Sequence, residues 1–284
     1  MRYFRPATLD EALAIRREHD VVPLAGATDV YPAAVGRHAW GDPTHRDVLD
    51  LSRIEALRGV AVEGDHLRIG ALATWTELIR ADLPPLLDGL KRAAREVGGV
   101  QVQNRATIVG NACTASPAGD GIPNLMALDA AFEIAGPLPR LVPARDFFTG
   151  YRATACGPDE LVTGIRIPLA DAQGHFVKLG ARRYLVISIA MVAAVVETDA
   201  AGAIARARLA VGACSAAARR LDALEADLVG VPLARAAECV EPCHLAHLTP
   251  IDDVRASAGY RLAAALTLTR DALDDLARPQ ARAA

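Results

Sequence analysis

Residues 107–120 read TIVGNACTASPAGD, and they lie in the middle of a stretch, 98–123, that has no helical or strand period. Gly, Asn, Thr, Ser, Pro and Asp dominate this stretch. Connecting loops of this length are usually either functional or disordered. The isolated apolar residues Val100, Val102, Ile108 and Val109 argue against disorder. We therefore predict one long, ordered loop that carries function.

A second turn of small residues precedes this loop in the chain. Val21–Leu24 is typical of a short buried strand, and residues 25–30, which follow it, read AGATDV. Consecutive backbone N–H groups in such a turn bind anions, although a turn of this kind is more often only structural. Residues 107–111 of the long loop offer a similar array of N–H groups. The two turns, 25–30 and 107–111, could hold a pyrophosphate from both sides, with the hydroxyl groups of Thr28, Thr107, Thr114 and Ser116 nearby. Each hydrogen bond to an ionised phosphate contributes about 1.5–3 kcal/mol.

Asp120 ends the quoted stretch and has two interpretations. A phosphate would repel its carboxylate, whereas the hydroxyl groups of a ribityl chain or a ribose would donate hydrogen bonds to it. The alternative is a turn or N-cap residue ahead of the next helix.

Common catalytic and metal-binding motifs are absent. The sequence contains no G-x-G-x-x-G at the start of a helix, no phosphate-binding P-loop and no G-x-S-x-G. The spacing of Cys239, Cys243, His244 and His247 matches neither the common zinc sites nor the haem attachment motif. We therefore expect no metal site and no protein acid, base or nucleophile in catalysis.

The rest of the chain predicts a mixture of helices and strands. Helices are expected over 8–18, 83–97, 125–132 and 255–276, and strands over 48–51, 67–70, 160–168, 176–180, 187–198 and 203–212. A turn at 199–202 joins the last two strands, which with 176–180 form an antiparallel set. The run 187–196 is most simply a buried strand, and its functional alternative is an apolar wall for a flat aromatic ligand beside Lys178.

Composition excludes several classes of protein. The 284 residues are 52% hydrophobic and 23% charged, which excludes wholesale disorder, and the net charge of −3 excludes a strongly basic nucleic-acid binder. No apolar window is long enough to span a bilayer, and residues 1–6 lack the apolar core of a signal peptide. The odd count of five cysteines favours reduced thiols. We expect a cytoplasmic protein without a nucleic-acid partner.

The quoted stretch is similar to the pattern T-I-G-G-N followed by T-A-S-P-x-x-D, and residues 24–29 are similar to L-A-G-G-T-D. With these two motifs the chain resembles the FAD-binding medium subunit of the molybdenum hydroxylases, the group of xanthine dehydrogenase and carbon monoxide dehydrogenase. Further matches follow in the family's order across nearly the whole chain, at residues 148–152, 158–161, 165–168, 176–182 and 250–261.

The resemblance implies an α+β fold with two domains. Residues 1–171 would form a FAD-binding domain of the PCMH or vanillyl-alcohol-oxidase type, with subdomains at about 1–55 and 56–171. Residues 172–284 would form a smaller domain like the C-terminal domain of CO dehydrogenase flavoproteins, with a three-stranded antiparallel sheet and helices.

The resemblance also implies roles for individual residues. Residues that match the pyrophosphate-cradling loops are Leu24, Ala25, Gly26, Ala27, Thr28, Asp29, Val30, Thr107, Ile108, Gly110 and Asn111. Thr114 and Ser116 would add hydroxyl donors, and Asp120 would hold ribityl or ribose hydroxyls. Val162 and Ile187 match contacts of the isoalloxazine ring, and Lys178 matches a lysine near the flavin, where its positive charge would favour the anionic reduced ring.

Two positions differ from the family pattern, because Ala27 and Val109 replace glycines. Glycine serves where φ is positive or where a backbone approaches a ligand closely. We expect Val109, which is β-branched, to disturb the site more than Ala27.

By resemblance, the chain would be an electron-transfer subunit. It would take electrons from [2Fe-2S] clusters of a small subunit that works with a molybdopterin-binding large subunit, in a dimer of heterotrimers, and pass them to an acceptor such as NAD. Two alternatives are a stand-alone flavin oxidase of the vanillyl-alcohol-oxidase fold and a non-enzymatic scaffold subunit with a degenerate FAD site.

Overall fold

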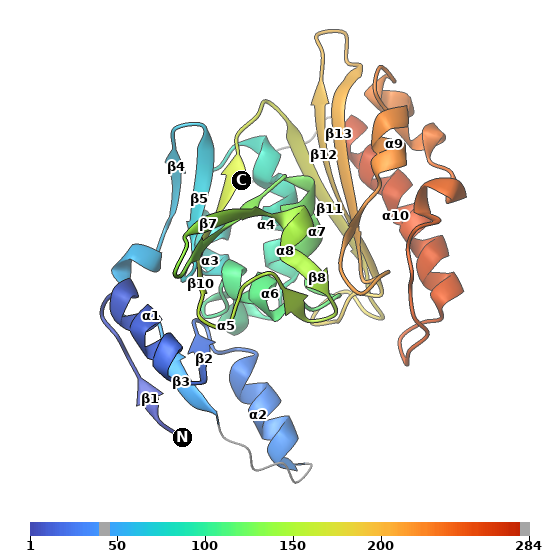
Figure 1. The fold of residues 1–284 in the computed structure, drawn as a ribbon. Coiled ribbons are helices and arrows are strands. Elements are labelled where there is room, and N and C mark those ends of the chain that lie inside the picture. Colours follow the sequence, from blue (N-terminus) through green and yellow to red (C-terminus); the bar gives the residue numbers. More distant parts are fainter. Residues whose placement is uncertain (40–45, 279–284) are drawn as a thin grey trace.

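Four β-sheets and the helices between them form the part of the chain that the structure, a computed structural model, describes, residues 1–39 and 46–278 (Figure 1). The N-terminal sheet is parallel and has the order β1-β3-β2, with β1 Tyr3–Phe4, β2 Val21–Leu24 and β3 Asp47–Asp50. The central sheet is antiparallel and has the order β4-β5-β10-β6-β7, with β4 Val60–Glu63, β5 His66–Gly70, β6 Ala131–Ala135, β7 Arg140–Pro143 and β10 Leu161–Pro168. The predicted strands at 21–24, 48–51, 67–70 and 160–168 are confirmed.

Two helices accompany the N-terminal sheet. The predicted helix after Thr8 is α1, Leu9–Glu18, and it begins with a capping box. Thr8 Oγ1 accepts from Glu11 N at 3.2 Å, and the Glu11 carboxylate accepts from Thr8 N at 3.4 Å. The second helix, α2, spans Val30–Ala39 and points away from the rest of the molecule (Figure 1). It begins at Val30, the last residue of the turn that follows β2.

The prediction of one long loop over 98–123 is wrong. The segment forms three short helices, α5 Val100–Gln103, α6 Ile108–Thr114 and α7 Gly121–Ala127. The helix predicted over 125–132 is confirmed only over residues 125–127, where α7 ends; Asp129 has a φ of +49° and the chain continues as β6, Ala131–Ala135. Helices of one or two turns repeat their apolar positions too few times to show a period, so sequence patterns miss them.

The C-terminal sheet contains the three predicted antiparallel strands, now β11 Gln173–Leu179, β12 Ala190–Thr198 and β13 Ile204–Gly212. A fourth strand, β14 Arg219–Arg220, pairs with β13, so the expectation of three strands falls one short. A two-residue strand carries no alternation that a sequence could reveal. The predicted turn is confirmed, since Asp199 Oδ1 accepts from Ala201 N and Ala203 N at 2.8 and 2.9 Å.

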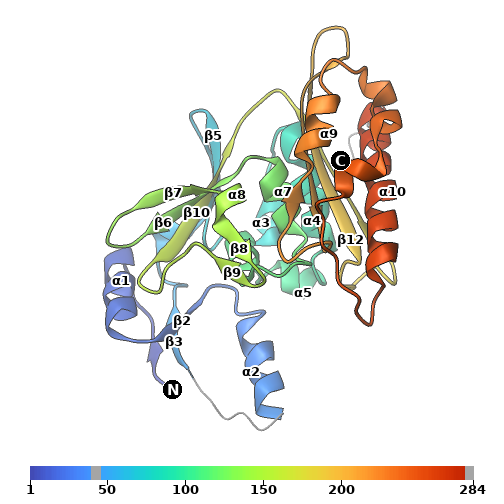
Figure 2. The same ribbon diagram turned by 45° about the vertical axis from the view of Figure 1, so that its right-hand side comes forward.

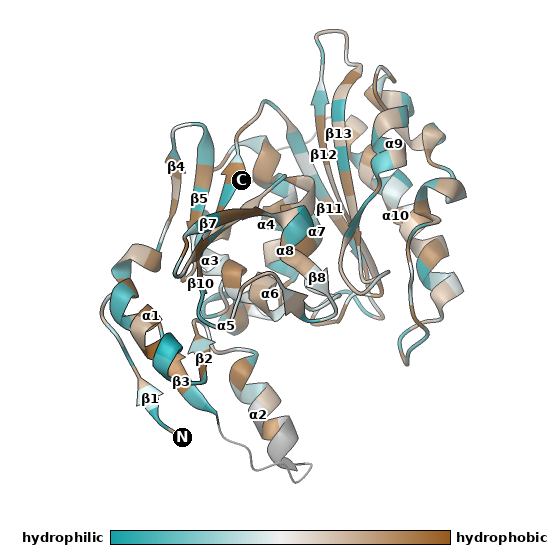
Figure 3. Cartoon of the chain, viewed as in Figure 1, coloured by the Kyte–Doolittle hydropathy of each residue, from teal (hydrophilic) through white to brown (hydrophobic). Residues whose placement is uncertain are grey.

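Helices cover both faces of β12. Met191, Ala193 and Val195 belong to the core that includes the central helices, while Ala190, Val192 and Ala194 belong to a second core with the long C-terminal helix. Figure 2 shows α4, Asp88–Glu96, and α7 on one side of this sheet and α10, Ala258–Ala277, on the other. The interpretation of a buried strand is therefore confirmed, and no face of β12 is left as a wall for a ligand. Figure 3 shows the same strand coloured as hydrophobic along most of its length.

The predicted helices at 83–97 and 255–276 are confirmed as α4 and α10, with Ser257 Oγ capping α10 by accepting from Tyr260 N at 3.2 Å. The remaining elements are η1 Glu55–Leu57, α3 Trp75–Arg80, η2 Pro85–Leu87, α8 Ala144–Phe147, β8 Phe148–Gly150, β9 Ala153–Thr154, α9 Asp222–Asp227, η3 Leu233–Cys239 and η4 Pro242–Leu245. Among the described residues, no helix combines the length and the apolar character that crossing a membrane requires.

Candidate functional site

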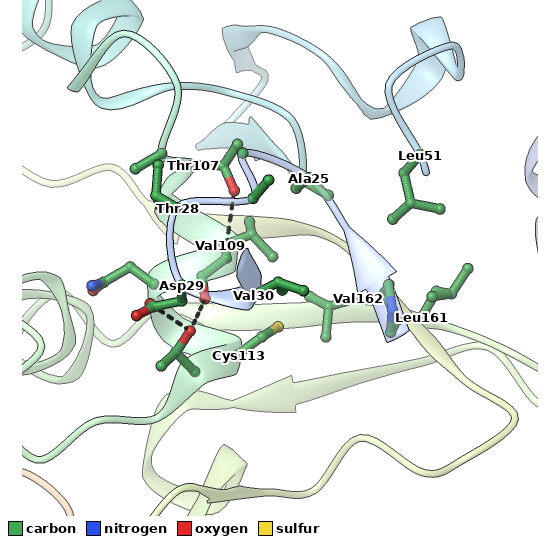
Figure 4. A pocket seen from close by; sticks show the side chains of 18 of the residues that line it. Ala25, Thr28, Asp29, Val30, Leu51, Thr107, Val109, Cys113, Leu161 and Val162 are labelled. Carbon is green, nitrogen blue, oxygen red and sulfur yellow. Dashed lines mark hydrogen bonds between the residues drawn. The ribbon is translucent and has the colours of Figure 1, made fainter. Parts of the chain in front are cut away.

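A cavity of about 500 Å³ lies where the turn 25–30, the start of α6 and β10 meet (Figure 4). Its volume is within the range of small-molecule and cofactor sites. The predicted site residues that line it are Ala25, Gly26, Ala27, Thr28, Asp29, Val30, Thr107, Gly110, Asn111, Thr114 and Val162. The structure thus brings together two segments that are about eighty residues apart in the sequence, as the two-turn interpretation predicted.

The N-termini of α2 and α6 both face this cavity. The first N–H groups of a helix have no intrahelical acceptor and give the N-terminus a partial positive charge. In α6, Ile108 N donates to Ala73 O at 3.2 Å and Gly110 N donates to Thr107 Oγ1 at 3.0 Å, which leaves the N–H of Val109 without an acceptor in the helix. In α2, Tyr31 N donates to Ala27 O at 3.4 Å and Ala33 N to Asp29 O at 3.1 Å, and Pro32 has no N–H. The N–H groups of Val30 and Val109 are thus the open ones, and together they favour an anionic ligand.

Asp29 is the acidic residue at the rim of this anion site. Its side chain is exposed, and its Oδ2 lies 3.1 Å from Thr114 Oγ1. The same hydroxyl lies 3.0 Å from Gly110 O, so Thr114 joins the end of the first turn to α6. The Asp29 carboxylate is therefore held by α6 at the exposed edge of the cavity.

Close packing of the backbones holds the first turn against the segment before α6. A Cβ on Gly26 would collide with Arg105 O and would lie 2.8 Å from Ala106 Cα. Only glycine fits at this contact, because any side chain would push the two backbones apart. This contact is what sets the two turns face to face.

The structure reverses the expectation about the two replaced glycines. Ala27 has a φ of +67°, the left-handed conformation that favours glycine, whereas Val109 lies in α6 and is buried in the core. The expectation that Val109 disturbs the site more is therefore wrong as regards backbone conformation. Val109 has the ordinary φ of a helical residue, so its position does not require glycine. Ala27 adopts the glycine-like conformation despite its Cβ, so the shape of the first turn is kept.

Two residues that line the cavity carry a buried polar atom without a partner. Among the described residues, Trp75 Nε1 and Asn111 Oδ1 make no hydrogen bond, and neither atom is accessible from the cavity. An unpaired buried donor or acceptor is costly and is rare in native proteins. Sequence reasoning missed Trp75, and its place directly after the Thr74 capping box gave no sign of this role.

Arg16, Cys113 and Cys156 also line the cavity. Arg16 Nε donates to Glu160 O at 2.6 Å and its Nη1 to Val21 O at 3.3 Å, so the guanidinium serves to join backbone segments. The protein around Cys113 raises the pKa of its thiol to about 12, and burial also raises the pKa of Cys156. A raised pKa favours the neutral thiol, which is the less nucleophilic form. This part of the lining is suited to binding a ligand, not to attacking it.

The other predicted site residues lie outside the lining of the cavity. Leu24 and Ile108 are buried in the core. Ser116 Oγ accepts from Ala118 N at 3.3 Å, and Ile187 is 52% exposed in the loop before β12.

Asp120 and Lys178 also lie outside the lining and form a buried ion pair, with Lys178 Nζ 2.6 Å from Asp120 Oδ2. Ser188 Oγ donates to Asp120 Oδ1 at 2.6 Å, so both carboxylate oxygens are occupied. Burial raises the pKa of Asp120, against the opposing effect of Lys178 and Ser188.

The cysteine and histidine group near η4 has structural partners. His244 Nε2 lies 3.0 Å from Asp227 Oδ2, and His247 Nε2 lies 2.9 Å from Arg220 O. Among the side chains that the structure describes, no three of His, Cys, Asp or Glu are arranged to hold a metal ion.

Comparison with known proteins identifies the family. The family model described as "FAD binding domain in molybdopterin dehydrogenase" matches residues 1–170. The chain belongs to this family. A second model, "CO dehydrogenase flavoprotein C-terminal domain", matches residues 175–276, so the expected α+β fold with a FAD-binding part and a flavoprotein C-terminal part is confirmed.

Relatives of this molybdopterin dehydrogenase flavoprotein match along most of its length. It is 34% identical to the carbon monoxide dehydrogenase medium chain of Afipia carboxidovorans over 99% of this chain and 97% of that one. It is 33% identical to the nicotinate dehydrogenase FAD-subunit of Eubacterium barkeri over 81% of this chain and 80% of that one. The solved structure of reconstituted CO dehydrogenase from Oligotropha carboxidovorans superposes with a TM-score of 0.87 at 29% identity, over 96% of each chain. The chain is therefore an oxidoreductase subunit of the FAD-binding medium type.

FAD, the cofactor of the family, fits the cavity that the described residues form. The open N–H groups at the starts of α2 and α6 suit its diphosphate, and the missing Cβ of Gly26 lets the turn 25–30 pack closely against the segment before α6. The apolar side chains of Val30 and Val162, which lie close together in Figure 4, supply a surface for a ring or a sugar chain.

Proposed function

We propose that this FAD-binding medium subunit transfers electrons within a molybdenum hydroxylase. It receives them from [2Fe-2S] clusters on a small partner subunit and passes them to an external acceptor such as NAD. The observation that carries the proposal is the convergence of the turn 25–30 and the start of α6 on one cavity. Such a cavity binds and orients a cofactor that brings its own reactivity.

The chain's residues act on the cofactor by position and charge. We assign the diphosphate to the turn 25–30 and to residues 107–111, where the N–H groups of Val30 and Val109 would donate hydrogen bonds to it. Thr114 holds Asp29 at the edge, which keeps its carboxylate at the rim of the diphosphate site. When bound, the flavin supplies the redox chemistry, and the protein supplies orientation and electrostatics.

The contacts of the flavin ring are assigned from the family pattern. Val162 on β10 lines the cavity, which supports its assignment. Lys178 is assigned a place near the ring, where its ammonium, held by Asp120, favours negative charge on the reduced ring. Ile187 is exposed and would meet the ring only at its open side. Ser116 is assigned as a further hydroxyl donor.

The proposed partners follow from the names of the relatives. The carbon monoxide dehydrogenase medium chain and the nicotinate dehydrogenase FAD-subunit are named as subunits of larger enzymes. We infer a small [2Fe-2S] subunit and a large molybdopterin-binding subunit, together in a dimer of heterotrimers. We also propose the domain division 1–171 and 172–284, with subdomains near 1–55 and 56–171, supported by the separate sheets of the chain.

Expression of the chain with and without its two partner chains tests the proposal. The expected result is a chain that binds one FAD, seen as the visible absorption band of a flavin, and that co-purifies with both partners. In the complex, substrate should bleach the flavin band, and an acceptor should restore it. A chain that takes up no FAD, or a flavin that stays oxidised while the complex turns over, would contradict the proposal.

The two alternatives make different predictions. A stand-alone oxidase needs a base beside the flavin and would oxidise a small alcohol without partners. A scaffold subunit would bind no FAD, and the glycine-like φ of Ala27 argues against it, because the first turn keeps the shape that a binding site requires.

A further inference from the structure

Two loops lie at one end of the C-terminal sheet, the lower end in Figures 1 and 2. Residues 180–189 connect β11 to β12, and residues 249–257 lead into α10. The buried side chain of Arg261, on α10, joins the two loops. Its Nη1 donates to Ile189 O at 2.6 Å and its Nη2 donates to Asp253 Oδ1 at 2.7 Å. The two loops and the first turn of α10 therefore form one surface, which we call the loop face.

The loop face exposes many apolar side chains. Val254 is 99% exposed at the tip of its loop. The large apolar side chains exposed on the loop face are Tyr184, Leu185, Ile187, Ile251, Val254 and Tyr260. Single exposed apolar residues are ordinary on a protein surface, whereas a group of them marks a place that another molecule covers.

The backbone of the first loop has a costly shape that keeps its side chains outward. Leu185 has a φ of +53°, in the left-handed region that disfavours residues with a Cβ. Arg182 fixes this turn, since its Nε donates to Tyr184 O at 3.0 Å and its Nη2 donates to Leu185 O at 2.5 Å. Backbone strain of this kind is found at ligand clamps and switch regions. Here it gives Leu185 no burial within this chain, because the side chain is still 57% exposed.

The second loop is also ordered without a partner. Asp253 Oδ1 accepts from Arg255 N at 2.8 Å, and Asp252 Oδ1 accepts from Ala258 N at 2.5 Å. Both carboxylates of this loop therefore bind its own backbone, and Val254 is held between them and Arg255. A surface that is ordered before binding loses less conformational entropy when a partner docks.

The charge of the first loop is positive. Residues 180–189 contain Arg182 and Arg183 and no acidic residue, although the whole chain has a net charge of −3. The Arg183 guanidinium lies over the Tyr184 ring, 5.2 Å from its centroid, and no carboxylate among the described residues pairs with it. Arginine and tyrosine are enriched at the energetic centres of protein interfaces. The loop face therefore complements a partner surface that is apolar and carries carboxylates.

The first loop also borders the place assigned to the flavin ring. Lys178 Nζ lies 3.4 Å from Val186 O, and Ser188 Oγ donates to Asp120 Oδ1 at 2.6 Å. Ile187, which lies between these two contacts in the chain, is the residue assigned to the open side of the ring. A redox partner that covers the loop face would thus stand beside the flavin, where an electron has a short path to it.

We infer that the loop face binds the [2Fe-2S] partner subunit, through an apolar surface of that subunit that is bordered by carboxylates. The inference rests on the proposed function, which supplies this partner. A dinucleotide fits the face less well, because the exposed apolar side chains are spread over two loops and the first turn of α10. A second copy of this chain fits less well too, because a symmetric contact would bring two positive loops together.

Titration of the FAD-loaded chain with the separately purified [2Fe-2S] subunit tests the inference. Val254→Asp puts a charge at the apolar tip, and Arg183→Glu reverses the unpaired positive charge. Each should weaken binding of the subunit by about tenfold or more, as expected for a central interface residue, and should leave the visible band of bound FAD unchanged. Added salt should weaken binding of the unchanged chain more than that of Arg183→Glu.

Two exposed residues on other elements supply matched controls. Leu138→Asp adds a charge at an exposed apolar position between β6 and β7, and Arg17→Glu reverses an exposed charge on α1. Both elements lie apart from the C-terminal sheet in Figures 1 and 2. Both variants should bind the [2Fe-2S] subunit as the unchanged chain does.

Several outcomes would overturn the inference. Binding of Val254→Asp and Arg183→Glu as tight as that of the controls overturns it and leaves the proposed function intact. Normal binding of the subunit with slower reduction of NAD would assign the face to the acceptor. A chain that is a dimer by itself and becomes a monomer with Val254→Asp would assign the face to a second copy. If the unchanged FAD-loaded chain binds no [2Fe-2S] subunit, the proposed function fails and the inference fails with it. Should one variant lose its FAD band through misfolding, the other decides between these outcomes.

Discussion

The cavity wall and the contact between α7 and the C-terminal sheet treat buried polar groups in opposite ways. On the wall, Trp75 Nε1 and Asn111 Oδ1 have no partner. At the N-terminal end of α7, Lys178 and Ser188 occupy both oxygens of Asp120. At its C-terminal end, Arg220 Nη1 donates to Met126 O at 2.9 Å.

Unpaired atoms also occur on the C-terminal sheet, where His175 Nδ1 and Arg208 Nε have no partner among the described residues. What distinguishes the contact of α7 is that ionic pairs hold both of its ends. Arg220 also pairs with Asp129 at 2.7 Å and with Glu225 at 2.5 Å, and Arg220 itself is buried. Both ends of α7 are thus bound to the C-terminal sheet by ionic contacts. Substitutions at α7 should therefore lower stability, while substitutions at the cavity should change cofactor binding.

The largest effect is expected from Lys178→Met. The change leaves the Asp120 carboxylate buried with Ser188 as its remaining partner, and breaking a buried pair costs about 3–5 kcal/mol. Urea denaturation without cofactor measures the free energy of unfolding. Adding Asp120→Asn should recover much of the loss, because no buried charge then remains. Arg235→Met, which breaks the exposed pair with Glu238, is the control and should change stability by less than about 1 kcal/mol. A loss as small as the control's would mean that the α7 contact does not hold the fold.

Val109→Gly should also lower stability, although it restores the family's glycine. Val109 is buried in the first turn of α6, so the change removes buried apolar surface and adds glycine to a helix. We expect a loss of about 2–4 kcal/mol in the free energy of unfolding. A large gain in FAD affinity instead would indicate that the valine blocks the diphosphate site.

Gly26→Ala tests the close contact between the two turns. The added methyl group meets Arg105 O and Ala106 Cα, and overpacking of this kind costs about 1–3 kcal/mol. We expect FAD affinity to fall by about 5- to 150-fold in titrations of the chain. Gly259→Ala is the matched control, because a Cβ there meets no atom within 4 Å. Equal affinities of the two variants would show that the turns need not touch.

The smallest effect, of opposite sign, is expected from Ala27→Gly. Relief of the left-handed backbone strain is worth about 1–2 kcal/mol, and the greater freedom of glycine in the unfolded chain offsets about 0.4–1 kcal/mol of it. Thermal unfolding should therefore show a gain of roughly 1 kcal/mol or less, with FAD affinity unchanged. A loss of stability would mean that the Cβ of Ala27 makes a contact that the turn needs.

The sequence by itself determined the strands at 21–24 and 160–168, the capped helix after Thr8, the antiparallel C-terminal strands and the two turns that meet at the cavity. These features rest on local signals: alternation, caps and small-residue turns, which act between residues close in the chain. Only the tertiary structure decided that 98–123 contains three short helices, and that Ala27 and not Val109 has the positive φ. It also decided that both oxygens of Asp120 accept hydrogen bonds, while Trp75 Nε1 has no partner among the described residues. The physical reason is that hydrogen-bond partners and backbone contacts depend on segments that lie far apart in the chain, such as Gly26 and Arg105 or Asp120 and Lys178, and no local pattern records which of them meet.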